Sequence, residues 1–282
     1  MGTIYGKVVL LTGASSGIGK STAKLLMEKG FRVYGTSRKA GQPGSGNPAP
    51  EQQDGGSKGF IEMIKLDVCS EESVKKAVDY VLDKEGRIDI LINNAGFGIA
   101  GSVEDTSPEE AYSQFNTNFF GVHRMCRHVI PVMRKQGKGL IINVGSICGI
   151  MAIPYQSMYS ASKFALEALS EALRTEVKPF GIKVTIIEPG DTRTGFTDSR
   201  QIVAGARGDS PYKENFTKSV NGMAQAERSG TDPIVAAKVI ARIINMKNPP
   251  VRKSVGFFYK AVVFLKRFLP SRFVAYAIEK FY

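Results

Sequence analysis

The sequence predicts an α/β fold, in which a doubly wound parallel sheet carries helices on both faces. Short runs that are apolar throughout recur along the 282-residue chain, as in strands that are buried on both sides. Segments with helical periodicity and capping residues alternate with these runs, which is typical of a parallel sheet with crossover helices. The chain shows no internal repeat and no boundary of a second domain. We therefore expect one domain over residues 1–246, followed by a basic, amphipathic extension over 247–282.

The expected strands and helices follow in chain order. KVVLLT at 7–12 predicts the first buried strand, and Gly30 ends the helix after it. Ser107 and Glu110 form a capping-box pattern around Pro108, which occupies a first helical position. Further strands are expected at 31–36, 61–66, 88–92, 139–145 and 182–188. Further helices are expected at 71–84, at 158–178 and after Asp232-Pro233.

Two segments interrupt this alternation. Residues 39–59 contain six glycines and three prolines, so a helix is disfavoured and we expect a flexible surface loop in place of a crossover helix. Residues 195–230 are polar and weakly periodic, which is typical of a mobile lid over a substrate. An inert insertion is the alternative for this second segment.

Composition and charge exclude several classes of protein. The three cysteines are widely spaced and only two histidines are present, so neither a disulfide framework nor a metal site is expected, and a reducing, cytoplasmic compartment is favoured. No stretch approaches the roughly 18 apolar residues that cross a bilayer. Residues 247–282 hold eight basic side chains and one acidic side chain, a net +7 of the chain's +12. The chain has no recognised nucleic-acid-binding motif. The positive charge therefore favours an anionic cofactor, and contact of residues 256–282 with an anionic membrane surface, rather than binding to nucleic acid.

A glycine-rich turn joins the first strand to the first helix. Residues 12–19 read TGASSGIG, and glycines at this place allow a tight turn whose backbone N–H groups approach a pyrophosphate at the helix N-terminus. The motif therefore predicts a dinucleotide cofactor. The residues expected to contact it here are Gly13, Ser15, Ser16, Gly17, Ile18 and Gly19.

The end of the second strand indicates which dinucleotide is bound. A carboxylate there would bind the ribose 2′-hydroxyl of NAD, whereas a 2′-phosphate is bound by a cation and hydroxyls. The strand ends in Thr36-Ser37-Arg38-Lys39, and the next acid is Glu51. A guanidinium such as that of Arg38 can bind a phosphate through two parallel hydrogen bonds. Ser37 and Arg38 therefore predict NADP(H).

These features belong to a larger set of motifs. In chain order they are TGASSGIG at 12–19, Asp67-Val68, Asn93-Asn94-Ala95-Gly96, Asn118, Ser146, Tyr159-x-x-x-Lys163 and Pro189-Gly190. In this order and spacing they resemble the short-chain dehydrogenase/reductase family over residues 5–195, with a looser likeness to its NADP(H)-dependent hydroxysteroid and retinol dehydrogenase branch.

The resemblance carries several expectations. It implies a single Rossmann-like domain with seven parallel strands, and a homodimer or homotetramer. It implies that Asp67 and Val68 contact the adenine. The cofactor cleft would be lined by Asn94, Ala95 and Gly96, and the nicotinamide would be flanked by Pro189, Gly190, Thr192 and Thr194.

Ser146, Tyr159 and Lys163 indicate the chemistry. Tyr159 and Lys163 are four residues apart in an expected helix, so their side chains lie on one face. A cation one turn away, aided by the positive charge of an oxidised nicotinamide, favours the phenolate and lowers a phenol pKa that is ordinarily about 10. This suits Tyr159 as the general acid or base of carbonyl–alcohol interconversion. Lys163 is also expected to bind the nicotinamide ribose, and Ser146, at a strand end, to donate to the substrate oxygen. By resemblance, Asn118 holds a water that connects Lys163 to solvent.

The substrate expected from the sequence is a hydrophobic small molecule of steroid, retinoid or lipid type. The residues expected around the reacting carbonyl, besides Ser146 and Tyr159, are mostly apolar: Phe97, Ile99, Ile147, Met151, Ile153, Tyr155 and Met158. The tail, with a helix expected over about 257–269 and a break at Pro270-Ser271, could cover the cleft, lie on a membrane or pack on the domain. Two alternatives to a lipophilic-ketone reductase are a 3-oxoacyl-thioester reductase and a non-catalytic NADP(H)-binding redox sensor.

Overall fold

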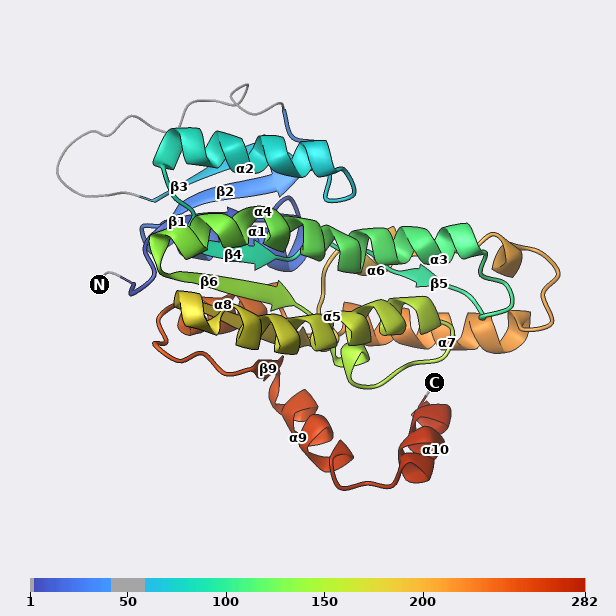
Figure 1. Cartoon of the computed structure of the whole chain (residues 1–282). Coiled ribbons are helices and arrows are strands. Elements are labelled where there is room, and N and C mark those ends of the chain that lie inside the picture. The colour runs from blue at the N-terminus through green and yellow to red at the C-terminus, as the bar shows by residue number, and fades with distance from the viewer. Residues whose placement is uncertain (1–2, 42–58, 282) are drawn as a thin grey trace.

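A wholly parallel sheet forms the centre of the molecule in the computed structural model, which describes residues 3–41 and 59–281 (Figure 1). Within those residues, seven strands follow the spatial order β3-β2-β1-β4-β6-β7-β9. The strands are β1 (Val8–Leu11), β2 (Arg32–Ser37), β3 (Phe60–Lys65), β4 (Ile90–Asn93), β6 (Gly139–Val144), β7 (Ile182–Pro189) and β9 (Arg252–Val255). The six strands expected from apolar runs are confirmed, and β9 completes the seven that the family resemblance implied.

Helices cover both faces of the sheet. One face carries α1 (Gly17–Glu28) and α8 (Pro233–Ile244), and the other carries α2 (Glu71–Glu85), α4 (Gly121–Gln136) and α5 (Ser157–Glu176). The central strands are mostly apolar because successive side chains point to opposite faces, and helices cover both. In β1, Val8 and Leu10 join the core under α2 and α4, whereas Val9 and Leu11 join the core under α1 and α8. All four are fully buried, and such burial stabilises the fold by roughly 1.5–3 kcal/mol per side chain.

Capping residues set the helix ends as the sequence predicts. The Ser107 hydroxyl accepts a hydrogen bond from Glu110 N at 3.2 Å, and the Glu110 carboxylate accepts one from Ser107 N at 3.0 Å. This capping box opens α3 (Pro108–Phe115), with proline in its first turn. Asp232 caps α8 with its side chain alone: the carboxylate accepts a hydrogen bond from Ile234 N at 2.8 Å.

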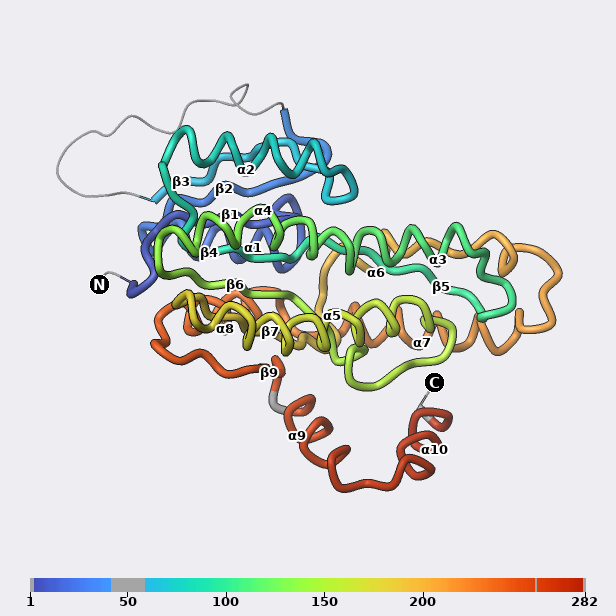
Figure 2. Tube along the Cα trace, viewed as in Figure 1, coloured from blue at the N-terminus to red at the C-terminus, as the bar shows by residue number. Residues whose placement is uncertain are grey.

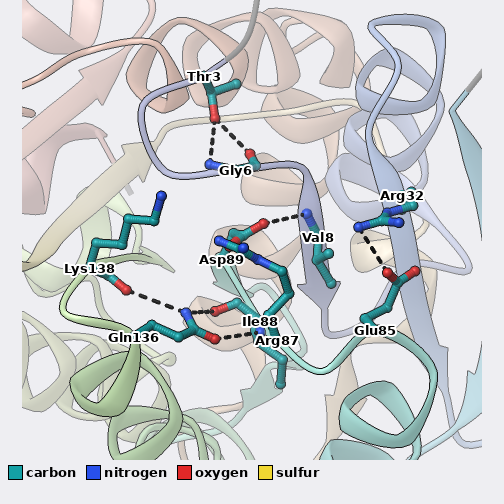
Figure 3. Close-up of polar contacts among 10 residues, drawn as sticks. All are labelled: Thr3, Gly6, Val8, Arg32, Glu85, Arg87, Ile88, Asp89, Gln136 and Lys138. Carbon is teal, nitrogen blue, oxygen red and sulfur yellow. Dashed lines mark hydrogen bonds and ion pairs between the residues drawn. The ribbon is translucent and has the colours of Figure 1, made fainter. Parts of the chain in front are cut away.

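Polar contacts around Asp89 close the end of the sheet at which the strands begin, here called the amino edge (Figure 3). The Asp89 side chain is only 1% exposed. One carboxylate oxygen accepts a hydrogen bond from Val8 N at 2.9 Å, and the other accepts from the Arg87 guanidinium. A side chain on Gly6 would collide with this carboxylate, so the chain enters β1 through a glycine with φ of 123°. Since this edge is filled, space for a ligand is left at the opposite, carboxyl edge.

The strand order places a crevice at that carboxyl edge. From β1 the chain runs outward to β2 and β3, and then returns to β4 and continues in the other direction to β6, β7 and β9. The order therefore reverses between β1 and β4, where open parallel sheets bind their ligands. Beyond the crevice, β5 (Ile99–Ala100) pairs in parallel with β8 (Gln201–Ile202).

The two irregular segments have different outcomes. Most of the loop expected over 39–59 falls at 42–58, outside the described residues. Residues 195–230 contain α6 (Phe196–Ser199), β8 and α7 (Lys213–Arg228). α7 was not predicted, because a helix that buries only Phe216, Ser219 and Met223 shows weak apolar periodicity.

The tail forms two helices, α9 (Phe257–Lys266) and α10 (Ser271–Phe281), which are separated at Pro270 as expected. α9 ends three residues before the expected position 269. The tube in Figure 2 shows the pair as the two arms of a V that leaves the body after β9. Within residues 3–41 and 59–281, no helix combines the length and the apolar character needed to cross a membrane.

Candidate active site

A cleft of about 1070 Å³ opens at the carboxyl edge of the sheet. It brings together nearly all the cofactor-binding and catalytic residues that the sequence predicts. Those in its wall are Gly13, Ser15, Ser16, Gly17, Ile18, Ser37, Arg38, Asp67, Val68, Asn94, Ala95, Gly96, Ser146, Tyr159, Lys163, Pro189, Gly190, Thr192 and Thr194. Gly19 and Asn118 lie directly behind this wall and support it.

The glycine-rich turn has the shape of a phosphate cradle. Gly13 and Gly17 take the left-handed conformation, with φ of 66° and 52°, which favours glycine. Gly19 packs α1 against the turn, since a Cβ there would lie 2.2 Å from the Gly13 carbonyl oxygen. The Asn94 side-chain amide donates to the carbonyl oxygens of Thr12 at 3.0 Å and Gly13 at 2.9 Å. Asn94 therefore holds the turn in place, and backbone N–H groups remain available at the start of α1.

The end of β2 supplies the cationic side of the cleft. Thr36, Ser37, Arg38 and Lys39 all line the wall, and no acid stands among them. Within the described part of the chain, the exposed Arg38 guanidinium makes no ion pair. The Asp67 carboxylate opposite is engaged in a local turn, because it accepts a hydrogen bond from Cys69 N at 2.9 Å.

Ser146, Tyr159 and Lys163 converge on one wall of the cleft. Ser146 follows β6, and its hydroxyl accepts a hydrogen bond from Cys148 N at 3.1 Å. Lys163 Nζ donates to the Val144 carbonyl at 2.9 Å and lies 5.8 Å from the centre of the Tyr159 ring. The helical spacing therefore places phenol and ammonium on one face of α5, as predicted.

Burial dominates the pKa values of this pair. Burial raises the pKa of Tyr159, and only a hydrogen bond with Ser146 and the charge of Arg200 lower it. Burial also lowers the pKa of Lys163 to about 8. In the protein alone, desolvation of the phenol outweighs the charges around it. The lowering expected from Lys163 together with an oxidised nicotinamide stays a prediction. The proton therefore stays on Tyr159 at neutral pH.

Two buried carboxyl groups lie behind Lys163. Glu167, one helical turn further along α5, is 6% exposed, and Glu188 in β7 is fully buried. Burial and the neighbouring Glu188 raise the pKa of Glu167 to about 8. Arg252 of β9 lies 3.7 Å from Glu167 and 3.6 Å from Glu188. Glu167 is thus largely protonated near neutral pH and does not neutralise Lys163 as a full anion would.

Asn118 sits in a π-helical turn, residues Asn116–Phe120, of a kind often found at functional sites. Its side-chain amide donates to the Phe97 carbonyl at 3.0 Å and to Ser162 Oγ at 3.3 Å, and its oxygen accepts from Phe97 N at 3.1 Å. A Cβ on Gly96 would lie 3.1 Å from this oxygen and 4.0 Å from Lys163 Nζ. Asn118 therefore adjoins Lys163 and orders the backbone of the cleft wall.

The apolar wall differs in part from the expected one. Phe97, Ile147, Met151 and Ile153 line the cleft as predicted. Three expected residues do not line it and instead join a separate cluster with Val203 and Phe216; they are Ile99, Tyr155 and Met158. The assignment of Tyr155 to the substrate is therefore corrected: its ring packs edge-on against Phe216 of α7, with ring centres 5.7 Å apart.

Most wall residues that the sequence did not single out come from the lid segment and the tail, whereas Gln156 and Asp191 come from the loops before α5 and after β7. They include Gln156, Asp191, Phe196, Met223, Glu227, Tyr259, Leu265 and Ile278. The Tyr259 ring lies over Gly190, where a Cβ would come within 2.1 Å of it. At the other end of α9, Lys266 Nζ donates to the Ile150 carbonyl. α9 therefore spans the mouth of the cleft, which is the first of the three arrangements considered for the tail.

Fold and site together define an oxidoreductase of the dinucleotide-binding α/β class. The chain belongs to the short-chain dehydrogenase family, whose model matches residues 7–202, and it acts on CH–OH and keto groups. A 3-ketodihydrosphingosine reductase from Bacteroides thetaiotaomicron is 45% identical over 98% of both chains. Retinol dehydrogenase 8 from Bos taurus is 32% identical over 94% of this chain and 86% of its own. The crystal structure of a short-chain dehydrogenase from Streptomyces avermitilis superposes with a TM-score of 0.75, at 32% identity and 93% coverage of each chain.

Proposed function

We propose that the chain is an NADP(H)-dependent reductase that converts a long-chain, lipid-like ketone to an alcohol. One observation carries the proposal: a single cleft of about 1070 Å³ joins the glycine cradle, Arg38, the pair Tyr159 and Lys163, and an apolar wall. The residues present fit the cofactor, since the positive-φ glycines leave backbone N–H groups exposed for a pyrophosphate.

The roles of the side chains follow from their places. The bound nicotinamide supplies the hydride, and the chain's own groups handle the proton. Ser146 donates to the carbonyl oxygen of the substrate and orients it. Tyr159, whose raised pKa keeps its proton at neutral pH, gives that proton to the forming alkoxide. Lys163 stabilises the phenolate that is left, and Asn118 fixes the backbone beside it.

The substrate class is supported by two features. The apolar wall combines residues from the body, such as Met151, with Leu265 and Ile278 of the tail. The relative that is 45% identical over 98% of both chains is named for a long-chain keto substrate. Residues 195–230 act as the lid in this proposal, since Phe196 and Met223 of this segment line the same cleft.

A substrate panel tests the proposal. With NADPH, we expect kcat/KM for 3-ketodihydrosphingosine to exceed those for a steroid ketone, for retinal and for a 3-oxoacyl thioester by at least about tenfold. Efficient turnover of the thioester alone would overturn the proposal in favour of a reductase of fatty-acid synthesis. Cofactor binding without turnover of any carbonyl would favour the redox-sensor alternative.

The preference for NADP(H) rests on Arg38 and has its own test. Replacing Arg38 by aspartate removes the cation expected at the 2′-phosphate and adds an anion, so NADPH affinity should fall by about 100-fold. NADH affinity should change by less than about threefold. Fluorescence titration with both cofactors measures this. Lys24→Asp, an exposed site on α1 outside the cleft wall, makes the same charge change as a control. Equal losses for NADPH and NADH would refute the role of Arg38.

We also propose that the tail contacts an anionic membrane surface. We place the protein in the cytoplasm, as a homodimer or homotetramer. Large apolar side chains of α9 and α10 are exposed, and they include Phe258, Phe264, Phe268, Phe273 and Tyr276. Basic side chains stand among them, as in helices that lie on anionic bilayers. A cleft whose mouth lies under these helices could receive a lipid directly from such a surface.

A further inference from the structure

Asp191 is a carboxylate in the cleft wall that the roles above leave unused. It directly follows Pro189 and Gly190 and lines the same cleft as Ser146 and Tyr159. One of its carboxylate oxygens accepts a hydrogen bond from the hydroxyl of Tyr259, and that hydroxyl also accepts a hydrogen bond from Asp191 N at 3.1 Å. The tail therefore fixes the direction of this carboxylate.

The charges around Asp191 leave it without a cationic partner. Glu227, the other acid noted in this part of the wall, is paired with the buried Arg200 and accepts a hydrogen bond from Thr197 Oγ1 at 2.6 Å. Lys163 Nζ is directed to the Val144 carbonyl. Asp191 makes no ion pair with any residue of the described part, although it is half-buried. Of these two acids, Asp191 is therefore the one whose negative charge no cation of the described residues neutralises.

The position of Asp191 relates it to the reacting carbonyl. The pKa of the Cys148 thiol is raised to about 11, chiefly by burial and in smaller part by the carboxylates of Asp191 and Glu227. Cys148 N donates to Ser146 Oγ at 3.1 Å, and Ser146 is the expected donor to the substrate oxygen. Asp191 thus acts electrostatically on the side of the cleft where the carbonyl would bind. A partly desolvated carboxylate there is costly unless a cation joins it.

We propose that Asp191 binds the ammonium group of an amino ketone, with the amine close to the carbonyl that is reduced. This rests on the proposed ketone reductase function. A neutral steroid or retinoid has no cationic group for this carboxylate, and an acyl thioester has no cation beside its ketone. 3-Ketodihydrosphingosine has an ammonium on the carbon next to its ketone and a long apolar chain, which match Asp191 and the apolar wall respectively.

The test compares two ketones that differ only in the amine. They are 3-ketodihydrosphingosine and 1-hydroxyoctadecan-3-one, which carries hydrogen in place of the amino group. Asp191→Asn should lower kcat/KM for the amino ketone by about 10- to 100-fold, mainly through KM, since it removes a charge-assisted hydrogen bond. For the analogue the loss should stay below about threefold. Asp83→Asn, on α2 and outside the cleft wall, removes one exposed negative charge and should change neither value.

A second variant separates recognition of the amine from anchoring of the tail. Tyr259→Phe removes the hydroxyl that holds Asp191 but keeps the carboxylate, so the preference for the amino ketone should persist even if both rates fall. NADPH affinity and thermal unfolding of each variant report on folding. Equal losses for both ketones in Asp191→Asn would make Asp191 an anchor only and overturn the inference. Wild-type protein that reduces both ketones equally would also overturn it and leave the reductase function standing, whereas reduction of neither would overturn the proposed function itself.

Discussion

Tyr159→Phe is expected to lower kcat by at least about a thousandfold while changing NADPH affinity by less than about twofold. The substitution keeps the ring, which packs against Phe196 with centres 5.5 Å apart, and removes only the hydroxyl that carries the proton. Without it, hydride arrival leaves an alkoxide whose assigned proton donor is missing. Single-turnover measurements with a ketone, together with fluorescence titration of NADPH, give both quantities.

Tyr155→Phe is the matched control for this experiment. It is the same chemical change four residues away, at a ring that packs on Phe216 outside the cleft wall. Its kcat should stay within about twofold of that of the wild type. Turnover that survives in Tyr159→Phe would refute the assigned proton donor, and a large loss of NADPH affinity would show that the hydroxyl serves binding instead.

Gly19→Ala is expected to weaken NADPH binding by about 100-fold and to destabilise the fold by about 1–3 kcal/mol. The added Cβ would stand 2.2 Å from the Gly13 carbonyl oxygen and 2.5 Å from Asn94 Nδ2. Because the Gly13 oxygen is backbone, the turn itself must move. The N–H groups that point toward the pyrophosphate move with it. Denaturant unfolding and cofactor titration measure the two effects.

Gly222→Ala provides the comparison for Gly19→Ala. Gly222 also lies inside a helix, α7, but a Cβ there meets no atom within 4 Å. Alanine should therefore leave NADPH affinity unchanged and raise stability by up to about 1 kcal/mol, since glycine is a poor helix former. If both variants bound NADPH equally well, the close packing at Gly19 would have no part in shaping the cradle.

The fold was predictable where burial determines the sequence. Strands covered on both faces are apolar at most positions, so β1, β4 and β6 stand out as apolar runs. β9 (Arg252–Val255) reads RKSV and lies at the edge of the sheet, where its side chains meet solvent and ion-pair partners. Apolar content therefore gave no sign of it. α7 was missed for a similar reason, because few of its side chains are buried.

The site was predictable where one local motif suffices and not where distant segments meet. The helical spacing of Tyr159 and Lys163 and the strand–turn–helix at Gly13 set their own geometry. Tyr155 lies only four residues before Tyr159, yet its backbone has a positive φ of 58° and its ring packs against Phe216. Asp191 becomes notable only beside Tyr259, which lies on α9, far along the chain. An acid directly after Pro189-Gly190 was the sequence signal that could have indicated it.

The pairing of α1 with α8 delays completion of the fold during synthesis. β1, β2 and α1 leave the ribosome early, but Leu26 of α1 is buried in a core that also needs Ile240 and Ile244 of α8. Contacts of such sequence separation form late because a long loop must close first. One apolar face of the nascent sheet stays open until almost the whole chain is made. A chain that stops before Pro233 would keep that face in water and would be prone to aggregate.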